Sequence, residues 1–502
     1  MDGKSGLGGQ LESFRAARRE VEESVLPLAT SVDGRRFSFQ ASLHGLELQA
    51  GSYAVLDDGD TQRLGQVLSV ELHQQLAGEL TLPASAAGGP EARTEIQVRY
   101  ARGEGIIVDG STAPFHDALI HPAAGSDVLA WQRRGTGHHA QLVLGELALA
   151  PGVPCVADAA GFSRHTFLCG QSGSGKTYSL GVILERLLIE TDLRLVIFDP
   201  NSDFTRLGQV RAGADPALAE RYRKIADQVA VFSAGAPGER RLRLHAAEVE
   251  PAVQAASLRL DPIADREEYA ALAALLAGSS APSIETLAKD NVPEVARLGM
   301  RIRNLGVDRY SVWAPHETGS ILDAVHDQSI RCVVIDLGSL PTREEQSLIA
   351  ATVLGDLWRR RQERNPVLIV VDEAHNVCPA EPFDPVAAVA AEHAIRIAAE
   401  GRKFGLYLLL STQRPQKIPQ NVLSQADNLV LMRLNSLADA AFAEAVFSFV
   451  PPSLIERSAT FRMGEALIAG KISPHQPALL RFGARISEEG GADVPATWAA
   501  PR

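Results

Sequence analysis

The chain has 502 residues, of which 45% are hydrophobic and 22% are charged, so its composition is that of a globular protein with room for two or three cores. The formal net charge of −12 argues against a surface that binds nucleic acid all over, although it still allows a local basic channel. The sequence contains no run of about 18 apolar residues and begins without the apolar segment of a secretory signal. The four cysteines are scattered, which is typical of small buried side chains in a reducing compartment. We therefore expect no membrane span and a cytoplasmic location.

The first third of the chain changes its hydrophobic period once. Apolar residues recur at helical spacing over residues 11–28, so we predict an N-terminal helix within residues 1–30. Over about residues 36–100 the period becomes two, in short β-rich runs separated by Gly, Asp, Pro and Ser. This pattern indicates a small β-barrel or sandwich. We assign residues 31–150 to a β-barrel, with a final strand near 142–149 leading out of it.

After residue 152 strand-like and helix-like segments alternate, which predicts an α/β fold with a mostly parallel sheet covered on both faces. The predicted strands are apolar runs at residues 165–169, 194–198, 331–337, 367–372 and 406–411. Between the second and third strands, residues 206–325 have helical periodicity and are predicted to form an inserted helical subdomain. The core then comprises residues 151–205 and 326–482. Residues 483–502 are predicted to be a flexible tail.

The segment HTFLCGQSGSGKT, at residues 165–177, combines a strand, a Gly-rich turn and the start of a helix. It fits the phosphate-binding pattern G-x4-G-K-[ST], in which backbone N–H groups and the positive end of the helix surround a β-phosphate. In this pattern Lys176 reaches the β- and γ-phosphates, and the Thr177 hydroxyl coordinates Mg²⁺. A chance match in a Gly/Ser turn is disfavoured by the strand and helix around it. The predicted ATP ligands are Gly170, Gln171, Ser172, Gly173, Ser174, Gly175, Lys176, Thr177 and Tyr178.

A second motif, VLIVVDEAH, places two acids at the end of an apolar strand. Asp372 is predicted to hold the magnesium ion, usually through its water shell. Glu373 is predicted to polarise the attacking water as a general base. The alternative, a solvated acidic pair that caps the next helix, is disfavoured because the phosphate-binding loop is also present.

A third motif, EGRKFGLYLLLSTQRP, ends another apolar strand with an amide. Gln413 is predicted to contact the γ-phosphate or the attacking water. Arg402 lies at a glycine turn just before this strand. It is either an arginine that reaches a neighbouring subunit's ATP or a solvated cation at a helix end, and spacing alone does not separate the two.

Together these motifs resemble the HerA/FtsK superfamily of ring-forming DNA-translocating ATPases, and HerA in particular. The resemblance rests on the three motifs above and on IFDPNSDF and IPQNVLSQADNLVLMRL, and covers about residues 140–482. It implies a RecA-like P-loop ATPase core behind a HerA-type N-terminal barrel. The spacing of DEAHN and GRKFG…STQRP is specific, whereas the phosphate-binding loop alone is not.

The resemblance also implies roles for individual residues. Gln413 matches the family's sensor glutamine, Arg402 its arginine that acts on the adjacent subunit, and Arg164 an arginine near the nucleotide. Asp199 and Asp203 match acidic positions of the family's second strand. This chain has Ser-Asp-Phe where the family usually has Gly-Glu-Tyr, which leaves the part of Asp203 in hydrolysis open.

The resemblance further implies a homohexamer with ATP at the subunit interfaces, duplex DNA in a central pore, and a partner nuclease or antiphage effector. We expect a motor enzyme that uses ATP and Mg²⁺. The alternative is an assembly platform that activates a partner effector, with translocation secondary. A conjugative or septal pump predicts N-terminal membrane helices, and a metabolic kinase needs an acceptor pocket; neither is indicated. The basic runs at residues 133–134 and 359–361, with Arg364 and Lys403, are candidate DNA contacts, but such runs are usually solvated helix faces.

Overall fold

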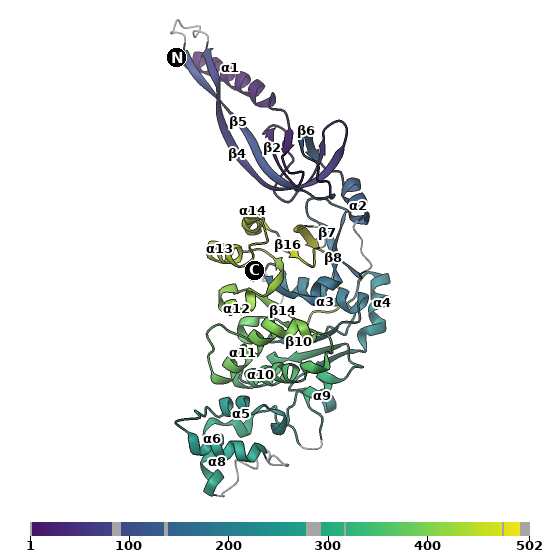
Figure 1. The fold of residues 1–502 in the computed structure, drawn as a ribbon, viewed down its shortest axis with the longest axis vertical. Helices are drawn as coiled ribbons and strands as arrows, with labels where there is room; N and C mark the ends of the chain where they lie inside the picture. The colour runs from purple at the N-terminus through teal and green to yellow at the C-terminus, as the bar shows by residue number, and fades with distance from the viewer. Residues whose placement is uncertain are drawn as a thin grey trace, which may run out of the picture.

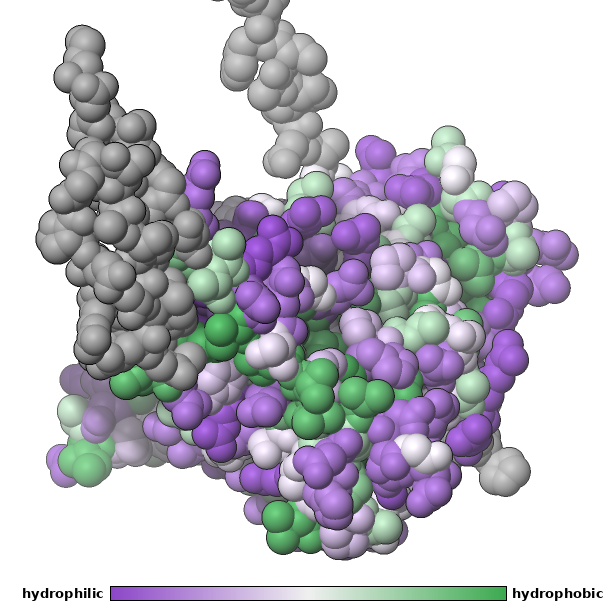
Figure 2. Space-filling model, turned by 90° about the horizontal axis from the view of Figure 1, so that it is seen from above, coloured by the Kyte–Doolittle hydropathy of each residue, from purple (hydrophilic) through white to green (hydrophobic). Residues whose placement is uncertain are grey.

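The computed structural model describes residues 3–82, 92–134, 139–277, 293–315, 318–473 and 476–491. The molecule is elongated, with a β-barrel at one end, a large sheet in the middle and a small group of helices at the other end (Figure 1). Seen from the barrel end, hydrophilic residues cover much of the visible surface, with smaller apolar areas between them (Figure 2). No helix in these ranges is both long and apolar enough to cross a bilayer.

The N-terminal part is helix α1 (Gly3–Glu23) followed by a closed six-stranded barrel, which confirms the barrel predicted from the period of two. Its strands are β1 (Leu28–Ser31), β2 (Arg36–Ser42), β3 (Tyr53–Asp57), β4 (Gln62–Leu82), β5 (Ala92–Ile107) and β6 (Phe115–Pro122). Alternate residues of β2 are buried, and Phe37 and Phe39 fill the interior. Gly105 of β5 lies opposite Phe37 of β2, and a Cβ added to Gly105 would lie 2.2 Å from Phe37 Cζ. A glycine is needed there because the aromatic ring occupies the space of a side chain.

The middle of the molecule is an eleven-stranded sheet in the order β11-β12-β10-β13-β14-β9-β15-β16-β17-β7-β8. The strands from β11 to β15 pair in parallel, and the remaining pairs are antiparallel. The bounds are β7 Gln141–Leu147, β8 Pro154–Asp158, β9 His165–Cys169, β10 Arg194–Asp199, β11 Val229–Phe232, β12 Cys332–Asp336, β13 Val367–Val371, β14 Leu406–Thr412, β15 Ala426–Leu431, β16 Glu465–Gly470 and β17 Ala478–Phe482. All five strands predicted for the core are present, so the α/β core is confirmed.

The sheet also contains a segment that the sequence assigned to the barrel. Strand β7 pairs with β17 and β8, with Leu147 opposite Leu480. The strand predicted near residues 142–149 to lead out of the barrel is therefore β7, and it is part of the sheet. It lies between the edge strand β8 and β17, and β17 comes from the C-terminal part of the chain, a distant pairing that local periodicity does not encode.

Helices cover both faces of the parallel strands. Leu195 and Ile197 of β10 face one hydrophobic cluster, while Val196 and Phe198 face the other. The helices around the sheet are α2 (Gly125–Arg134), α3 (Lys176–Glu190), α4 (Pro216–Ala226), α9 (Ile321–His326), α10 (Arg343–Arg359), α11 (Pro385–Glu400), α12 (Gln420–Leu423), α13 (Leu437–Val446) and α14 (Pro452–Glu456). Strands buried on both faces explain why the sequence shows continuous apolar runs rather than alternation.

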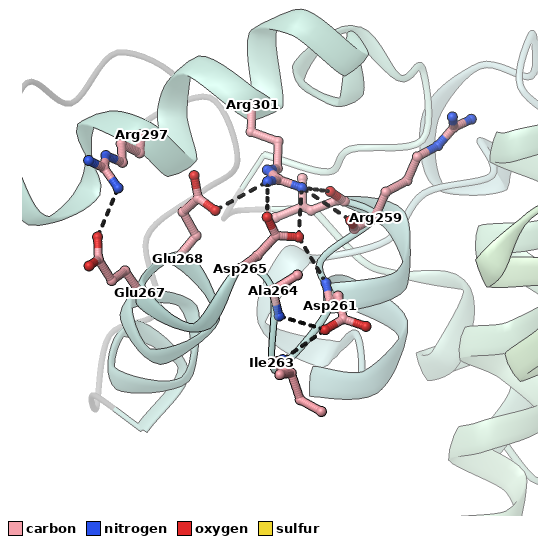
Figure 3. A network of polar contacts seen from close by, with 10 residues as sticks. Arg259, Asp261, Ile263, Ala264, Asp265, Glu267, Glu268, Arg297 and Arg301 are labelled. Atoms are coloured by element: carbon pink, nitrogen blue, oxygen red, sulfur yellow. Dashed lines mark hydrogen bonds and ion pairs between the residues drawn. The ribbon is translucent and has the colours of Figure 1, made fainter.

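The segment predicted as an inserted helical subdomain, residues 206–325, divides into two parts. Its first part belongs to the core, since α4 follows β10 and β11 pairs in parallel with β12. Its middle part forms a separate helical group with its own apolar cluster, made of α5 (Pro251–Ser257), α6 (Arg266–Ala277) and α8 (Pro293–Leu305). Arg301 of α8 joins α8 to α6, with Nη2 2.7 Å from Asp265 Oδ1 and 3.1 Å from Glu268 Oε2 (Figure 3).

The segment 483–491, predicted to belong to a flexible tail, is packed against α3. Arg485 and Glu185 are both fully buried, and their side chains lie 3.4 Å apart. Glu185 also accepts hydrogen bonds from the backbone N–H groups of Ile486 and Ser487, both at 2.7 Å. The guanidinium lies over Gly181 in the middle of α3, where an added Cβ would be 2.6 Å from Nε. Low local hydrophobicity concealed this anchor, which depends on a charge pair; the rest of the predicted tail lies outside the described residues.

Replacing Glu185 with alanine is expected to lower the free energy of unfolding by about 3 to 5 kcal/mol, because it leaves the Arg485 guanidinium buried without its charge partner. The measurement is the midpoint of urea unfolding followed by circular dichroism. Glu190→Ala is the matched control, since Glu190 lies on the same helix and pairs with Arg221 near the surface. Loss of that exposed pair is expected to cost less than about 1 kcal/mol. Equal midpoints for the two variants would contradict the assignment.

Candidate nucleotide-binding site

The Gly-rich loop lies at the carboxyl end of β9, beside the carboxyl ends of the neighbouring parallel strands. Gly173 and Gly175 have φ angles of +75° and +87°, a conformation that residues with a Cβ rarely adopt. Gly170 has no room for a side chain, since an added Cβ would lie 2.7 Å from Met432 Cβ. Lys176 is the first residue of α3, so the positive end of that helix faces the loop. The backbone thus forms a cradle for a phosphate group.

Two distant segments hold the loop in place. The N–H of Gly464 donates to Ser174 O at 2.9 Å, and the N–H of Gln171 donates to Arg433 O at 3.0 Å. These contacts come from the loop before β16 and from the end of β15, so the cradle is part of the sheet rather than a free turn.

The ammonium group of Lys176 is buried among acceptors. Its Nζ lies 2.9 Å from both Asp372 Oδ1 and Glu373 Oε1, and it donates to Ser411 Oγ at 3.1 Å. Ser411 Oγ in turn donates to Asp372 Oδ1 at 2.7 Å. Burial alone would lower the pKa of Lys176, but the two carboxylates beside it raise the pKa above its ordinary value. The lysine is therefore charged and neutralised by the two acids of the second motif.

Glu373 directly follows β13 in a left-handed backbone conformation, with φ of +40°. Burial would raise the pKa of its carboxyl, but the His375 side chain and the Lys176 charge together lower it to about 2. Its Oε2 lies 3.2 Å from His375 Nδ1. In this arrangement Glu373 is ionised, as a proton acceptor has to be, and is held by Lys176.

Asp372 is buried completely, and its Oδ2 has no hydrogen-bond partner. An unpaired buried carboxylate oxygen fits an acceptor for a hydrated magnesium ion, and Thr177 lines the neighbouring cleft. In the described ranges no group of three or more His, Cys, Asp or Glu side chains could hold a metal ion by itself. The residues therefore fit an ion that is held mainly by phosphates and water, and the roles of Asp372 and Thr177 stay predictions.

A cleft of about 810 Å³ lies in front of these groups. The predicted residues that line it are Gln171, Ser172, Gly173, Gly175, Lys176, Thr177, Tyr178, Glu373 and Gln413. Gly170, Ser174 and Asp372 are buried behind them. Other lining residues escaped the sequence analysis, namely Asn201, Met463, Gly464, Arg481, Phe482, Gly483, Ala484, Glu489 and Gly491. The C-terminal members of this group carry no motif, because they reach the cleft only through strands β16 and β17 and the buried anchor that follows.

The acids of the second strand lie beside the same cleft. Asp199 accepts hydrogen bonds from the N–H groups of Asp203 and Phe204 at 3.0 and 2.8 Å. Burial, with the nearby charge of Asp372, raises the pKa of Asp199 to about 7 and that of Asp203 to about 6. Asp203 lines the cleft, whereas Asp199 shapes the turn behind it. Asp199 and Asp203 therefore add acidic groups to those that Asp372 and Glu373 place at the cleft.

Arg402 and Arg164 lie elsewhere. Arg164 precedes β9 and Arg402 precedes β14, so both are at the amino ends of strands whose carboxyl ends carry the cleft. They converge on Asp427, with Arg402 Nη1 at 2.5 Å and Arg164 Nη1 at 3.8 Å from Oδ2. Five strand residues span about 16 Å, so neither arginine takes part in the cleft of its own chain. Arg164 therefore does not line this cleft, and its contact with nucleotide stays a prediction.

The basic run on α10 is engaged within the chain. Arg359 pairs with Asp356, Arg360 lies 2.7 Å from Glu363, and the Arg361 guanidinium stacks over Trp358. These contacts agree with the alternative that the run is a helix face with local partners.

Comparison with known proteins relates this architecture to one family. Residues 142–357 match the family described as the central domain of the helicase HerA. The DNA double-strand break repair helicase HerA of Sulfurisphaera tokodaii is 27% identical over 184 residues, 35% of this chain and 36% of that protein. The corresponding protein of Pyrococcus furiosus is 33% identical over 118 residues, 23% of this chain and 20% of that protein. A probable helicase of Methanocaldococcus jannaschii is 22% identical over 370 residues, 66% of this chain and 68% of that protein.

Among solved structures, VirB4 of Thermoanaerobacter pseudethanolicus aligns with a TM-score of 0.46 and 16% identity, over 70% of this chain and 97% of that one. The bacterial conjugative coupling protein TrwB aligns with a TM-score of 0.48 and 13% identity, over 74% and 94%. The match to the HerA of Sulfurisphaera tokodaii spans about a third of that protein.

Replacing Asp203 with asparagine is expected to change how nucleotide affinity depends on pH. Below pH 6 the Asp203 carboxyl is protonated, and above pH 6 its charge repels the triphosphate. At pH 5 the variant and the natural protein are expected to bind a fluorescent ATP analogue equally. At pH 8 the variant is expected to bind up to about tenfold more tightly, since one pKa unit corresponds to 1.36 kcal/mol.

The matched control for this measurement is Glu489→Gln, an acid of the same cleft whose side chain is 50% exposed. We expect it to change the affinity by the same factor at both pH values. Parallel pH curves for Asp203→Asn and the natural protein would contradict the assignment of this titration to Asp203.

Proposed function

We propose that this chain, whose residues 142–357 match the family described as the central domain of the helicase HerA, is an ATP hydrolase that drives the movement of duplex DNA. The observation that carries this proposal is that the predicted catalytic residues are divided between the carboxyl ends and the amino ends of the parallel strands. Lys176, Glu373 and Gln413 line the cleft at the carboxyl ends, while Arg402 lies at the amino end of β14. With one part of an ATP site at each end of the strands, a ring is favoured in which adjacent chains complete each other's sites.

The chemistry follows from the contacts in the cleft. When a triphosphate enters, Lys176 exchanges the carboxylates of Asp372 and Glu373 for the β- and γ-phosphates. Glu373 is then free to accept a proton from a water molecule. As it does so, the water oxygen attacks the γ-phosphorus, and the bond between the γ-phosphorus and the bridging oxygen breaks, so that ADP leaves. The amide of Gln413 orients that water or the γ-phosphate. A bound magnesium ion would offset charge on the phosphates, held by Thr177 and Asp372.

The ring explains the position of the arginines. Arg402 and Arg164 lie together on Asp427 at the edge away from the cleft, and Arg402 is partly exposed. In a ring this edge would face the cleft of the next chain, where a guanidinium stabilises charge in the transition state. In line with the resemblance to HerA, we propose a homohexamer in the cytoplasm. Duplex DNA would pass through its central pore, and a nuclease or defence effector would be its partner.

Glu373→Gln tests the hydrolytic role. The variant is expected to lose ATP turnover by a factor of about 10² to 10⁴, because glutamine cannot accept the proton of the attacking water. Turnover is measured with and without duplex DNA, and nucleotide binding is measured in parallel to show that the cleft is intact. Normal turnover in this variant would mean that Glu373 is not the base. Hydrolysis by the natural protein that duplex DNA does not stimulate would favour the assembly platform over the motor.

The shared site is tested by mixing two inactive chains. Arg402→Ala alone is expected to lower turnover by about 10³ or more. When it is mixed in equal amounts with Glu373→Gln, about a quarter of the interfaces in a random ring regain both residues, so activity should return. Arg396→Ala on α11 is the control, since Arg396 is exposed and pairs only weakly with Glu392. If mixing restores nothing, Arg402 does not act on a neighbouring chain.

A further inference from the structure

His375 lies between the predicted base and the strand that carries the predicted sensor. It belongs to the short 3₁₀ turn Ala374–Asn376 that follows Glu373, and its side chain is only 12% exposed. Its Nδ1 lies 3.0 Å from Thr412 Oγ1 and 3.2 Å from Glu373 Oε2. Thr412 is the last residue of β14 and directly precedes Gln413. One ring nitrogen therefore links the ends of β13 and β14.

This nitrogen has two partners and one proton site. Thr412 Oγ1 already accepts a hydrogen bond from the N–H of Arg414 at 3.0 Å, which fixes the position of the hydroxyl. When Nδ1 carries a proton it can donate to Glu373 Oε2 or to Thr412 Oγ1, but a single N–H serves one acceptor well at a time. In the described part of the chain Glu373 Oε2 forms no hydrogen bond; His375 Nδ1 lies 3.2 Å from it, while the hydrogen bond of that nitrogen goes to Thr412 Oγ1. The imidazole thus links Glu373, after β13, to Thr412, at the end of β14, through the single atom Nδ1.

Glu373 needs such support because its conformation is strained. A φ of +40° is uncommon for a residue with a side chain and costs on the order of 1 to 2 kcal/mol. The backbone is held by the N–H of Asn376, which donates to Glu373 O at 2.8 Å. The carboxylate is held by Lys176 on one oxygen and approached by His375 on the other. If Lys176 moves to a phosphate, His375 is the contact that still positions the carboxylate.

We propose that His375 is the positioning residue that aims Glu373 at the attacking water and ties its position to Thr412 and Gln413. His375 is not among the residues that line the cleft, and it acts through the carboxylate. This inference rests on the proposed function, in which Glu373 is the general base. It predicts that the base and the sensor at the ends of β13 and β14 move as one unit when the γ-phosphate is bound or lost.

The test compares two substitutions of the same residue. Asparagine places its amide nitrogen near the position of Nδ1, whereas leucine fills similar space without a donor. His375→Leu is expected to lower kcat by about 10²-fold, as for a displaced catalytic group, and to leave the affinity for ATP within about twofold. His375→Asn is expected to recover most of that loss. A role in stability alone would instead move the unfolding midpoint and the affinity together, with no rescue by asparagine.

A second series uses Thr412→Val, which removes the hydroxyl with little change of shape. It is expected to lower kcat several-fold, and its combination with His375→Leu should be no worse than His375→Leu alone, because both act through one contact. Additive losses would overturn the link between the two strands.

A third background separates this inference from the proposed function. In the Glu373→Gln protein, His375→Leu should have no further effect. If Glu373→Gln hydrolyses ATP normally, the proposed base is wrong. If Glu373→Gln is inactive while His375→Leu is fully active, only the positioning role is wrong. Should His375→Leu fail to fold, the kcat values of His375→Asn and Thr412→Val still decide the question.

Discussion

The ammonium group of Lys176, buried between the carboxylates of Asp372 and Glu373, is the interaction around which the rest of the site is arranged. A buried charge without a partner is costly, and here the charge of Lys176 is balanced by the two acids that we propose to serve magnesium and water. Lys176 and Asp372 are 196 residues apart in the sequence. They meet because β9 and β13 are parallel strands of one sheet with their carboxyl ends on the same side.

The same arrangement explains why nucleotide entry changes the state of Glu373. With Lys176 beside it, the Glu373 carboxyl has a low pKa and is held away from any other task. In the proposed mechanism a triphosphate would compete for the lysine and release the carboxylate in one exchange. Asp199 and Asp203 lie beside the same cleft, and burial, with the nearby charge of Asp372, raises their pKa values. In the proposed mechanism a cation that enters with the nucleotide would offset this acidity, next to the unpaired oxygen of Asp372.

The C-terminal part of the chain closes the site from the other side. Gly464 holds the Gly-rich loop, and β17 and residues 483–491 line the cleft. Their position depends on the buried Arg485 and Glu185 pair on α3, the helix that begins with Lys176. The cleft, helix α3 and the C-terminal segment are therefore packed together as one part of the fold.

The sequence by itself determined the chemistry of the cleft and the class of the fold. Lys176 and Thr177 were predicted from the Gly-rich pattern that follows an apolar strand. Asp372, Glu373 and Gln413 were predicted because each follows an apolar strand, and parallel strands bring such ends together. The barrel was identified because its period of two is a local property of the chain. Neither inference needs knowledge of which strands are neighbours.

Only the tertiary structure decided which distant segments pair. It moved β7 from the barrel to the sheet, gave α4 and β11 to the core, and turned residues 483–491 from a tail into a packed wall of the cleft. It also separated Arg164 and Arg402 from the cleft by the length of a strand. These outcomes depend on long-range pairing and on buried charge, and neither leaves a periodic signal in the residues that take part.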